Sequence, residues 1–205
     1  MINDTRKEFT ESWLAEMPTG IPDISFFNVI KKNLLEMSKY YPIQEVKPHL
    51  YKISGKATAY YWFGDKQNFD LIAEIDKKSQ SIVINAVAKN PLLKGQPPFA
   101  SDLYVEILND NDNSILFSDK ILSMNGLAVW KNLIKNGYAI SVFDEHNPGK
   151  TRQTFQDPEQ LDNFFQIHND DYARYRYVLS KQGPQLAETI AYFNTRRMRE
   201  LAGTL

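Results

Sequence analysis

The chain has 205 residues, of which 42% are hydrophobic and 13% aromatic, enough to build a substantial hydrophobic core. Its 24 basic residues nearly balance its 25 acidic ones, so the formal net charge of −1 excludes a global attraction to nucleic acid or to an acidic membrane. The lack of cysteine excludes disulfides, thiolate nucleophiles and cysteine-ligated metal centres. With no apolar signal segment and no run of roughly 18 apolar residues, we expect a soluble, cytoplasmic protein without a membrane partner.

The first predicted element is an amphipathic helix at residues 24–39. Asp23 precedes it as a cap, and Ile30, Leu34 and Met37 fall at helical spacing before Pro42 closes the run. This helix belongs to a predicted N-terminal helical segment at residues 1–42.

Residues 49–90 then predict an antiparallel meander of about four strands. The segments are short, rich in β-branched and aromatic residues, and separated by turn-forming stretches such as "GDKQN" and "DKKSQ". They read "HLYKISG", "ATAYYWFGD", "FDLIAEID" and "SIVINAVAKN".

The pattern after the meander alternates between helix and strand. A helix is predicted within "PPFASDLYVEILNDND", a strand in "SILFS", a helix in "GLAVWKNLIKN" capped by Gly137, and a strand in "YAISVFD". The helical crossover lets the last two strands run parallel, with the helix covering the sheet.

The remaining chain predicts a polar loop at residues 145–160, a short helix at 157–168, a strand in "YARYRYVLSK" and a closing helix at 182–205. No repeat or low-complexity linker divides the chain. We therefore expect a single α/β (α+β) domain at residues 1–205, whose core at 43–181 combines an antiparallel meander with a helix-strand-helix-strand crossover in one mixed sheet, flanked by N- and C-terminal helices.

This order of elements, over residues 24–181, resembles the GNAT superfamily of N-acetyltransferases. The resemblance implies that the strand at 81–90, including Val87, holds the pantetheine of acetyl-CoA. It also implies that the loop "LLKGQPPFA" presents backbone N–H groups to the pyrophosphate at the start of a helix. The cofactor-binding residues would then be Val87, Lys94, Gly95, Gln96 and Ala100.

Several positions depart from the family pattern. Pro97 and Pro98 stand where donors or glycines are expected, and proline has no N–H to offer. Counting back from Gly137, Val129 replaces the family alanine and Leu133 the family tyrosine. The two prolines favour an alternative, in which a GNAT-like fold binds a partner without catalysis.

Ser118 and Asp119 end the strand "SILFS" and are the candidate catalytic pair. Ligands of crossover folds bind beyond the carboxyl ends of the strands, where Asp119 can act as a general base or hold an amine. The competing interpretation is that both side chains only bond to the backbone of the following turn.

Two further sets of residues are candidates for substrate or partner binding. Tyr60 and Trp62 share one face of a meander strand and either line a groove or belong to the core. Arg174 and Arg176 alternate with tyrosines and form either a solvated face or, with the arginines of the last helix, a phosphate-binding patch. The three histidines show no metal-ligand spacing, so no metal site is predicted.

The leading functional hypothesis is an N-acyltransferase that uses acetyl-CoA and transfers the acyl group directly to an amine of a small molecule or macromolecule, with Asp119 as the base. The alternative is a non-catalytic module that binds a protein or nucleic acid. A third hypothesis, an enzyme acting on nucleic-acid bases, requires a continuous arginine patch.

Overall fold

A computed structural model describes residues 23–78, 81–111, 115–119, 122–147, 154–165 and 174–180. The predicted closing helix at 182–205, with its arginines, and residues 1–22 of the N-terminal segment lie outside the described residues.

Within these ranges the chain forms nine strands, three α-helices and two short 3-10 helices. The strands are β1 (Gln44–Lys47), β2 (Leu50–Ser54), β3 (Thr58–Gly64), β4 (Phe69–Lys77), β5 (Ser81–Lys89), β6 (Ile115–Phe117), β7 (Ile140–Asp144), β8 (Thr154–Phe155) and β9 (Tyr175–Ser180). The helices are α2 (Asp23–Ser38), α3 (Ala100–Asp110), α4 (Met124–Lys135), η1 (Pro91–Leu93) and η2 (Pro158–Phe164).

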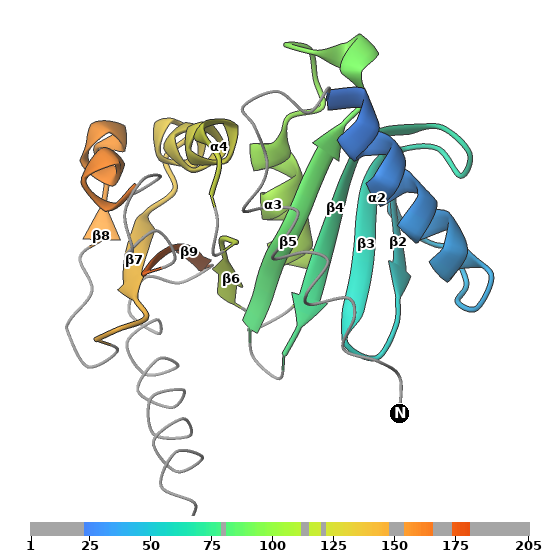
Figure 1. Ribbon diagram of the computed structural model, residues 1–205, viewed down its shortest axis with the longest axis horizontal. Coiled ribbons are helices and arrows are strands. Elements are labelled where there is room, and N and C mark those ends of the chain that lie inside the picture. Colours follow the sequence, from blue (N-terminus) through green and yellow to red (C-terminus); the bar gives the residue numbers. More distant parts are fainter. Residues whose placement is uncertain are drawn as a thin grey trace, which may run out of the picture.

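All nine strands belong to one mixed sheet, in the order β1-β2-β3-β4-β5-β6-β9-β7-β8 (Figure 1). Strands β1 to β5 form an antiparallel meander. The predicted meander is therefore confirmed, with β1 as an additional strand at its edge. The predicted mixed class of helices and strands around one sheet is confirmed as well.

The crossover connections give the sheet its parallel component. Helix α3 joins β5 to β6, and these two strands pair in parallel. Helix α4 joins β6 to β7, and both of these strands are antiparallel to β9, which lies between them. The strands β6 and β7 therefore run parallel as predicted, although they are not neighbours.

Helices cover both faces of the sheet (Figure 1). Helix α2 packs on the face that carries Tyr60 and Trp62. Helices α3 and α4 pack on the opposite face, which carries Tyr61 and is the larger of the buried clusters. Adjacent residues of β3 thus enter different cores because side chains alternate along a strand.

Two short elements differ from the sequence-based prediction. Strand β8 lies inside the segment predicted as a polar loop, where Phe155 pairs with Ile140 of β7. The predicted short helix is the 3-10 helix η2, with Pro158 at its start and Asp157 as its N-cap. A strand of two residues is too short to show a period, so only its tertiary partner reveals it.

Candidate functional site at the start of helix α3

The sheet opens where the parallel pair of strands separates. Only Ser81, Ile82 and Val83 of β5 pair with β6, although β5 continues to Lys89. Along the rest of β5, no described strand pairs with the edge that faces β6. The register between β4 and β5 also shifts between Glu74 and Ile75, which is the signature of a β-bulge. The carboxyl half of β5 consequently presents an unpaired edge, and Val87 lies on it, partly buried on the side of α3.

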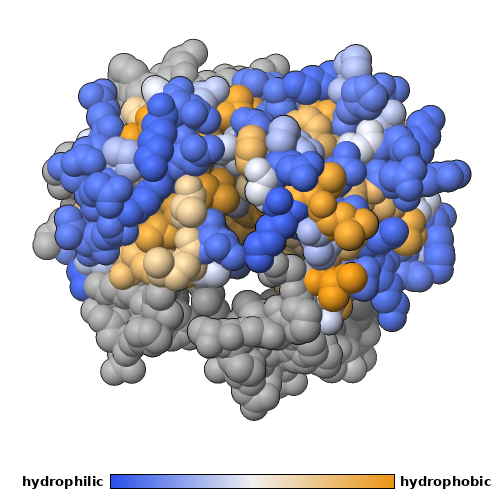
Figure 2. All heavy atoms as spheres, turned by 90° about the horizontal axis from the view of Figure 1, so that it is seen from above, coloured by the Kyte–Doolittle hydropathy of each residue, from blue (hydrophilic) through white to orange (hydrophobic). Residues whose placement is uncertain are grey.

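A groove of about 390 Å³ lies between the first turn of α3 and one face of α4. Viewed from above, the molecule is hollowed between its two halves, and hydrophobic residues are visible inside the hollow (Figure 2). The groove is lined by Phe99, Ala100, Ser101, Asn125, Ala128, Val129, Lys131, Asn132 and Lys135. Of the predicted cofactor residues, Ala100 lies directly in its wall.

Backbone N–H groups near the groove are available to an anion. The amides of Gly95, Ala100 and Ser101 have no hydrogen-bond acceptor among the described residues, whereas those of Asp102 and Leu103 bond to the carbonyl of Phe99 at 3.1 and 3.2 Å. Free amides in the first turn of a helix, together with the helix dipole, attract negative charge.

The loop that leads into α3 is held by one lysine. Lys89 Nζ donates to the carbonyl of Gln96 and, at 2.9 Å, to that of Pro98. The same ammonium lies 5.0 Å from the centre of the Phe99 ring. Lys89 thus holds two carbonyls of the loop, and of the amides at residues 90–99 only that of Gly95 has no acceptor among the described residues. Of the residues predicted to bind the cofactor in this loop, Gln96 supplies a carbonyl that accepts from Lys89. Gly95 has a positive φ of 76°, and no heavy atom lies within 4 Å of the position that a Cβ atom would take.

Two lysines of α4, Lys131 and Lys135, line the groove. Lys131 is paired with Asp162 at 2.7 Å and Glu159 at 3.0 Å, and the hydrogen bonds that it donates to these carboxylates raise its pKa. Lys135 is exposed at the rim and forms no ion pair with any described residue. Lys94 is also exposed, on the loop before α3.

Ser118 is fixed in the interior and is not free to react. It is 1% exposed, its Oγ accepts from the amide of Tyr177 at 3.0 Å and donates to the carbonyl of Asp119 at 3.0 Å. Its amide donates to the carbonyl of Tyr177 at 2.9 Å, and its carbonyl accepts from Arg176 at 3.0 Å. Ser118 therefore bonds across the sheet to β9 and to the carbonyl of the next residue rather than to the N–H groups of the following turn, and these contacts fix the position of Asp119.

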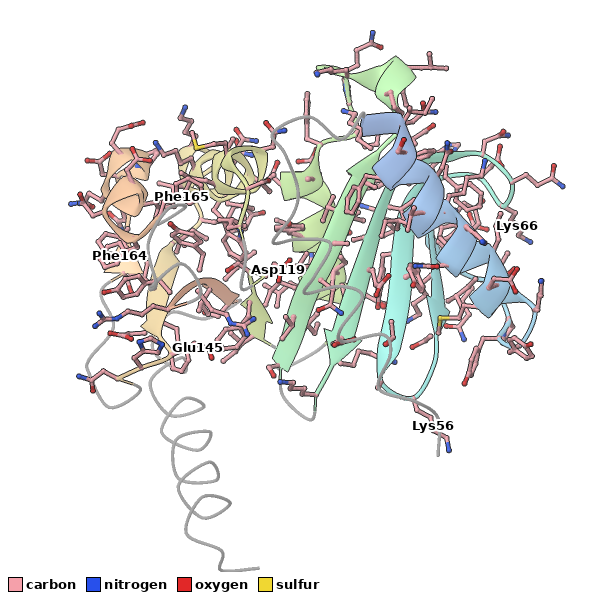
Figure 3. The ribbon with its side chains drawn as sticks, viewed as in Figure 1. Lys56, Lys66, Asp119, Glu145, Phe164 and Phe165 are labelled. Atoms are coloured by element: carbon pink, nitrogen blue, oxygen red, sulfur yellow. The ribbon has the colours of Figure 1, made fainter. Side chains whose placement is uncertain are left out.

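Asp119 lies just beyond β6, on the side of α3 and α4 (Figure 3). Its side chain is partly exposed. Burial raises the pKa of the neighbouring Tyr104 above its ordinary value, and the charge of Asp119 raises the pKa further. Asp119 and Tyr104 are therefore electrostatically coupled.

Arg176 of β9 and Arg174, which directly precedes this strand, form ion pairs with the end of β7. Arg174 binds both oxygens of Asp144, at 2.8 to 3.1 Å, and this pairing lowers the pKa of Asp144. Arg176 is 8% exposed and donates to Glu145 at 2.5 Å. Arg176 is therefore not part of a solvated face, because β9 lies inside the sheet with both faces covered.

Tyr60 and Trp62 lie in the core under α2, far from a groove wall. The Tyr60 hydroxyl donates to Glu74 at 2.6 Å, and Trp62 Nε1 donates to the carbonyl of Asp65 at 2.8 Å. Trp62 also stacks on Tyr51, with 5.6 Å between ring centres. Both side chains are fully engaged in packing and hydrogen bonding, which agrees with the core alternative.

Sequence reasoning missed three residues near the groove: Ser101, Asn132 and Tyr104. Asn132 Nδ2 donates to Ser101 Oγ at 2.9 Å and links α4 to α3. The helical period of residues 100–110 places Ser101 and Tyr104 on the buried face with Ile107 and Leu108, which is a signal that the sequence does contain.

Comparison with family models, with curated proteins and with solved structures yields no match for this chain. Among the described residues, no helix has both the length and the apolar character needed to cross a membrane. That same part of the chain brings together no group of three or more His, Asp or Glu side chains suited to a metal ion.

Proposed function

We propose that the protein is a GNAT-like N-acyltransferase that uses acetyl-CoA to acylate an amine. The observation that supports this most is the opening of the parallel β5–β6 pair along the carboxyl half of β5, from which the chain leads through η1 to the groove at the start of α3. A strand order in which β9 inserts between β6 and β7 after an antiparallel meander accords with the same proposal. Ligands of open sheets bind at such openings beyond the carboxyl ends of the strands.

The residues at this site fit the chemical parts of acetyl-CoA. The free amides of Gly95, Ala100 and Ser101, with Lys135 at the rim, suit the diphosphate. The unpaired edge of β5 near Val87 offers backbone groups to the amides of the pantetheine. When bound, the cofactor supplies an activated acyl group as a thioester.

The protein's own part in the reaction is to hold the amine and accept its proton. Asp119 is a carboxylate at the end of β6, and Ser118 and Arg176 fix the backbone that carries it. A positioned general base contributes roughly 10² to 10⁴ in rate. Direct transfer requires no nucleophile from the protein, in agreement with the lack of cysteine and with the burial of Ser118.

A thermal shift with acetyl-CoA and with CoA tests the proposal. A ligand at 100 times its Kd stabilises the native state by about 2.7 kcal/mol, which raises Tm by roughly 5 to 11 °C in a chain of this size. The control is Ala128→Trp, which places a large side chain at an exposed position in the groove and should abolish the shift without disturbing the core. No shift with wild-type protein at millimolar ligand would refute acetyl-CoA as the cofactor.

Asp119→Asn then tests the base. This variant should retain the thermal shift and lose acyl transfer by at least about 100-fold, because an amide cannot accept the proton. Transfer at the wild-type rate would remove Asp119 from the mechanism and leave the cofactor proposal intact.

The second candidate function is a non-catalytic binding module. It is favoured by the prolines at 97 and 98 and by the exposure of Leu92 (87%) and Phe99 (43%) on the same loop. A module of this kind should bind its partner when the groove is blocked, so Ala128→Trp should not affect it. A pull-down that is lost in Leu92→Asp but retained in Ala128→Trp would support this function over the enzyme.

A further inference from the structure

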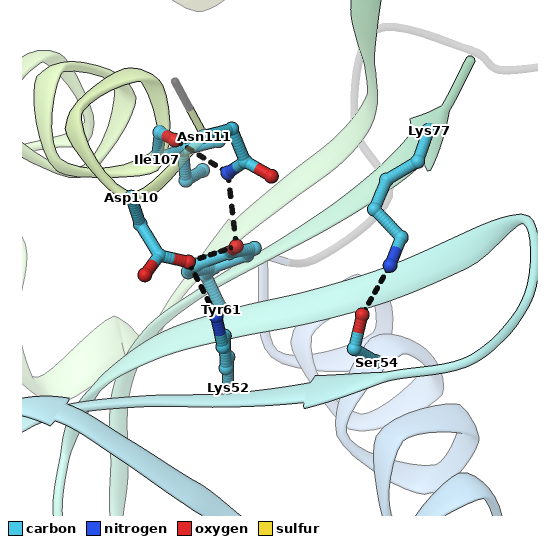
Figure 4. A network of polar contacts seen from close by, with 7 residues as sticks. All are labelled: Lys52, Ser54, Tyr61, Lys77, Ile107, Asp110 and Asn111. Atoms are coloured by element: carbon cyan, nitrogen blue, oxygen red, sulfur yellow. Dashed lines mark hydrogen bonds and ion pairs between the residues drawn. The ribbon is translucent and has the colours of Figure 1, made fainter. Parts of the chain in front are cut away.

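The two ends of helix α3 differ in how the fold uses their side chains. A hydrogen-bond network closes the last turn, where Asp110 accepts from Lys52 at 2.7 Å and from the Tyr61 hydroxyl at 2.5 Å (Figure 4). Asn111 Nδ2 donates to the same hydroxyl at 3.0 Å and to the carbonyl of Ile107 at 2.7 Å. These contacts commit the side chains of the last turn to the fold.

The first turn of α3 begins with an exposed aromatic side chain. Phe99 is the N-cap residue, a position that favours side chains with an oxygen atom, because that oxygen accepts a hydrogen bond from the helix. Phenylalanine has no such oxygen, and Phe99 is 43% exposed. It provides the helix with no side-chain cap and leaves apolar surface in water, so the stability of the fold does not explain its presence.

The Phe99 ring is held in place by a cation. The ammonium of Lys89 lies 5.0 Å from the centre of the ring and also donates to the carbonyl of Pro98, the residue directly before it. Of the two side chains in this contact, only that of Phe99 lines the groove. Lys89 therefore covers one side of the ring, and the side that lines the groove is left open as a fixed, flat, apolar surface.

The polar residues of the groove suit the edge of a purine base. The Asn125 carboxamide forms no hydrogen bond with a described residue, and that of Asn132 uses only one N–H, which it donates to Ser101 Oγ at 2.9 Å. A carboxamide presents a donor and an acceptor side by side, which matches the amino group and the adjacent ring nitrogen of adenine. The groove volume of about 390 Å³ lies within the range of small-molecule sites.

We propose that the Phe99 ring is the surface on which the purine base of a bound nucleotide stacks in this groove. The inference rests on the proposed function, which puts the diphosphate of coenzyme A at the first turn of α3. The same coenzyme carries an adenosine on that diphosphate, so its base lies beside the residue that starts the turn. Stacking on an aromatic side chain contributes to the affinity for a base through its flat face.

Isothermal titration calorimetry with ADP and with inorganic pyrophosphate tests the stacking, because only ADP carries a base. Phe99→Ala should weaken ADP roughly 5- to 150-fold and change pyrophosphate by less than about twofold. Phe99→Tyr keeps the flat ring and should retain ADP, whereas Phe99→Leu keeps apolar volume without the ring and should weaken it nearly as much as alanine. The control is Leu92→Ala on the same loop, which removes an 87% exposed side chain outside the groove lining and should change neither affinity.

The outcomes separate this subsite from the proposed function. Wild-type affinity for ADP in Phe99→Leu, or equal weakening of ADP and pyrophosphate in Phe99→Ala, would overturn the stacking role, because the ring would then only fill space or hold the start of the helix. Binding of acetyl-CoA without binding of ADP would also overturn it and leave the proposed function intact. Binding of ADP that depends on Phe99, without a thermal shift by acetyl-CoA, would refute the cofactor and retain the nucleotide subsite. Binding of neither ligand would overturn both.

Discussion

Replacing Arg176 by methionine should be one of the most damaging single changes in the sheet. Its guanidinium donates to Glu145 at 2.5 Å and to the Ser118 carbonyl at 3.0 Å, and its side chain is 9% exposed. Methionine approximates the length of the aliphatic stem and preserves much of its packing, so the change mainly removes the charge and the two hydrogen bonds.

The expected loss follows from these contacts. A hydrogen bond to a charged group contributes about 1.5 to 3 kcal/mol, and breaking a buried ion pair costs about 3 to 5 kcal/mol because the other charge remains. The side chain of Glu145 is 22% exposed, so water partly solvates its carboxylate and reduces the free-energy cost of leaving it unpaired. We therefore expect a destabilisation of about 3 kcal/mol, or a fall in Tm of roughly 6 to 12 °C.

Urea denaturation followed by circular dichroism measures this loss. The control is Arg174→Met, which removes a more exposed arginine (28% for its side chain) just before the same strand and should cost about 1 kcal/mol. The double variant Arg176→Met with Glu145→Gln should recover part of the stability, since no unpaired carboxylate remains. A loss under about 1 kcal/mol for Arg176→Met, or one equal to that of the control, would refute a stabilising role for this pair.

Two further predictions concern the backbone and the pH dependence of stability. Gly64→Ala should destabilise the protein by roughly 2 to 4 kcal/mol in chemical denaturation, because φ is 132° and a Cβ atom would lie 2.1 Å from the Asn68 carbonyl oxygen. Gly137→Ala, with φ at 88° and no heavy atom within 4 Å of the added Cβ, should cost only about 1 to 2 kcal/mol in the same assay. Equal losses for the two variants would contradict the steric argument. Because pairing with Arg174 lowers the pKa of Asp144 in the folded state, the stability that this carboxylate contributes is present above its unfolded pKa and is lost as pH falls through the folded one. Wild type should therefore lose stability more steeply than Arg174→Met between about pH 5 and pH 2, and parallel curves for the two proteins would contradict the linkage.

Local patterns in the sequence were sufficient to predict most elements of the fold. The helical spacing of Ile30 and Leu34 predicted α2, and the alternation along β3 predicted that Tyr60 and Trp62 share one face of that strand. Such patterns are reliable because each residue's face depends only on the period of its own helix or strand.

Residue contacts across the sheet were not predictable in the same way. The alternation of arginine and tyrosine at residues 174–177 is typical of an exposed strand, yet β9 lies between β6 and β7, and Arg174 and Arg176 pair with Asp144 and Glu145. No property of residues 174–180 alone indicates which strands flank them. The burial of Ser118 against β9 depends on the same neighbour relation.

The sequence by itself therefore determined the class of the fold, the order of its elements and the position of Asp119 at a strand end, because these follow from short-range periodicity and capping. Only the tertiary structure decided which residues meet. It inserted β9 between two parallel strands and opened β5 from β6. These features depend on contacts between segments that are distant along the chain, which local spacing does not specify.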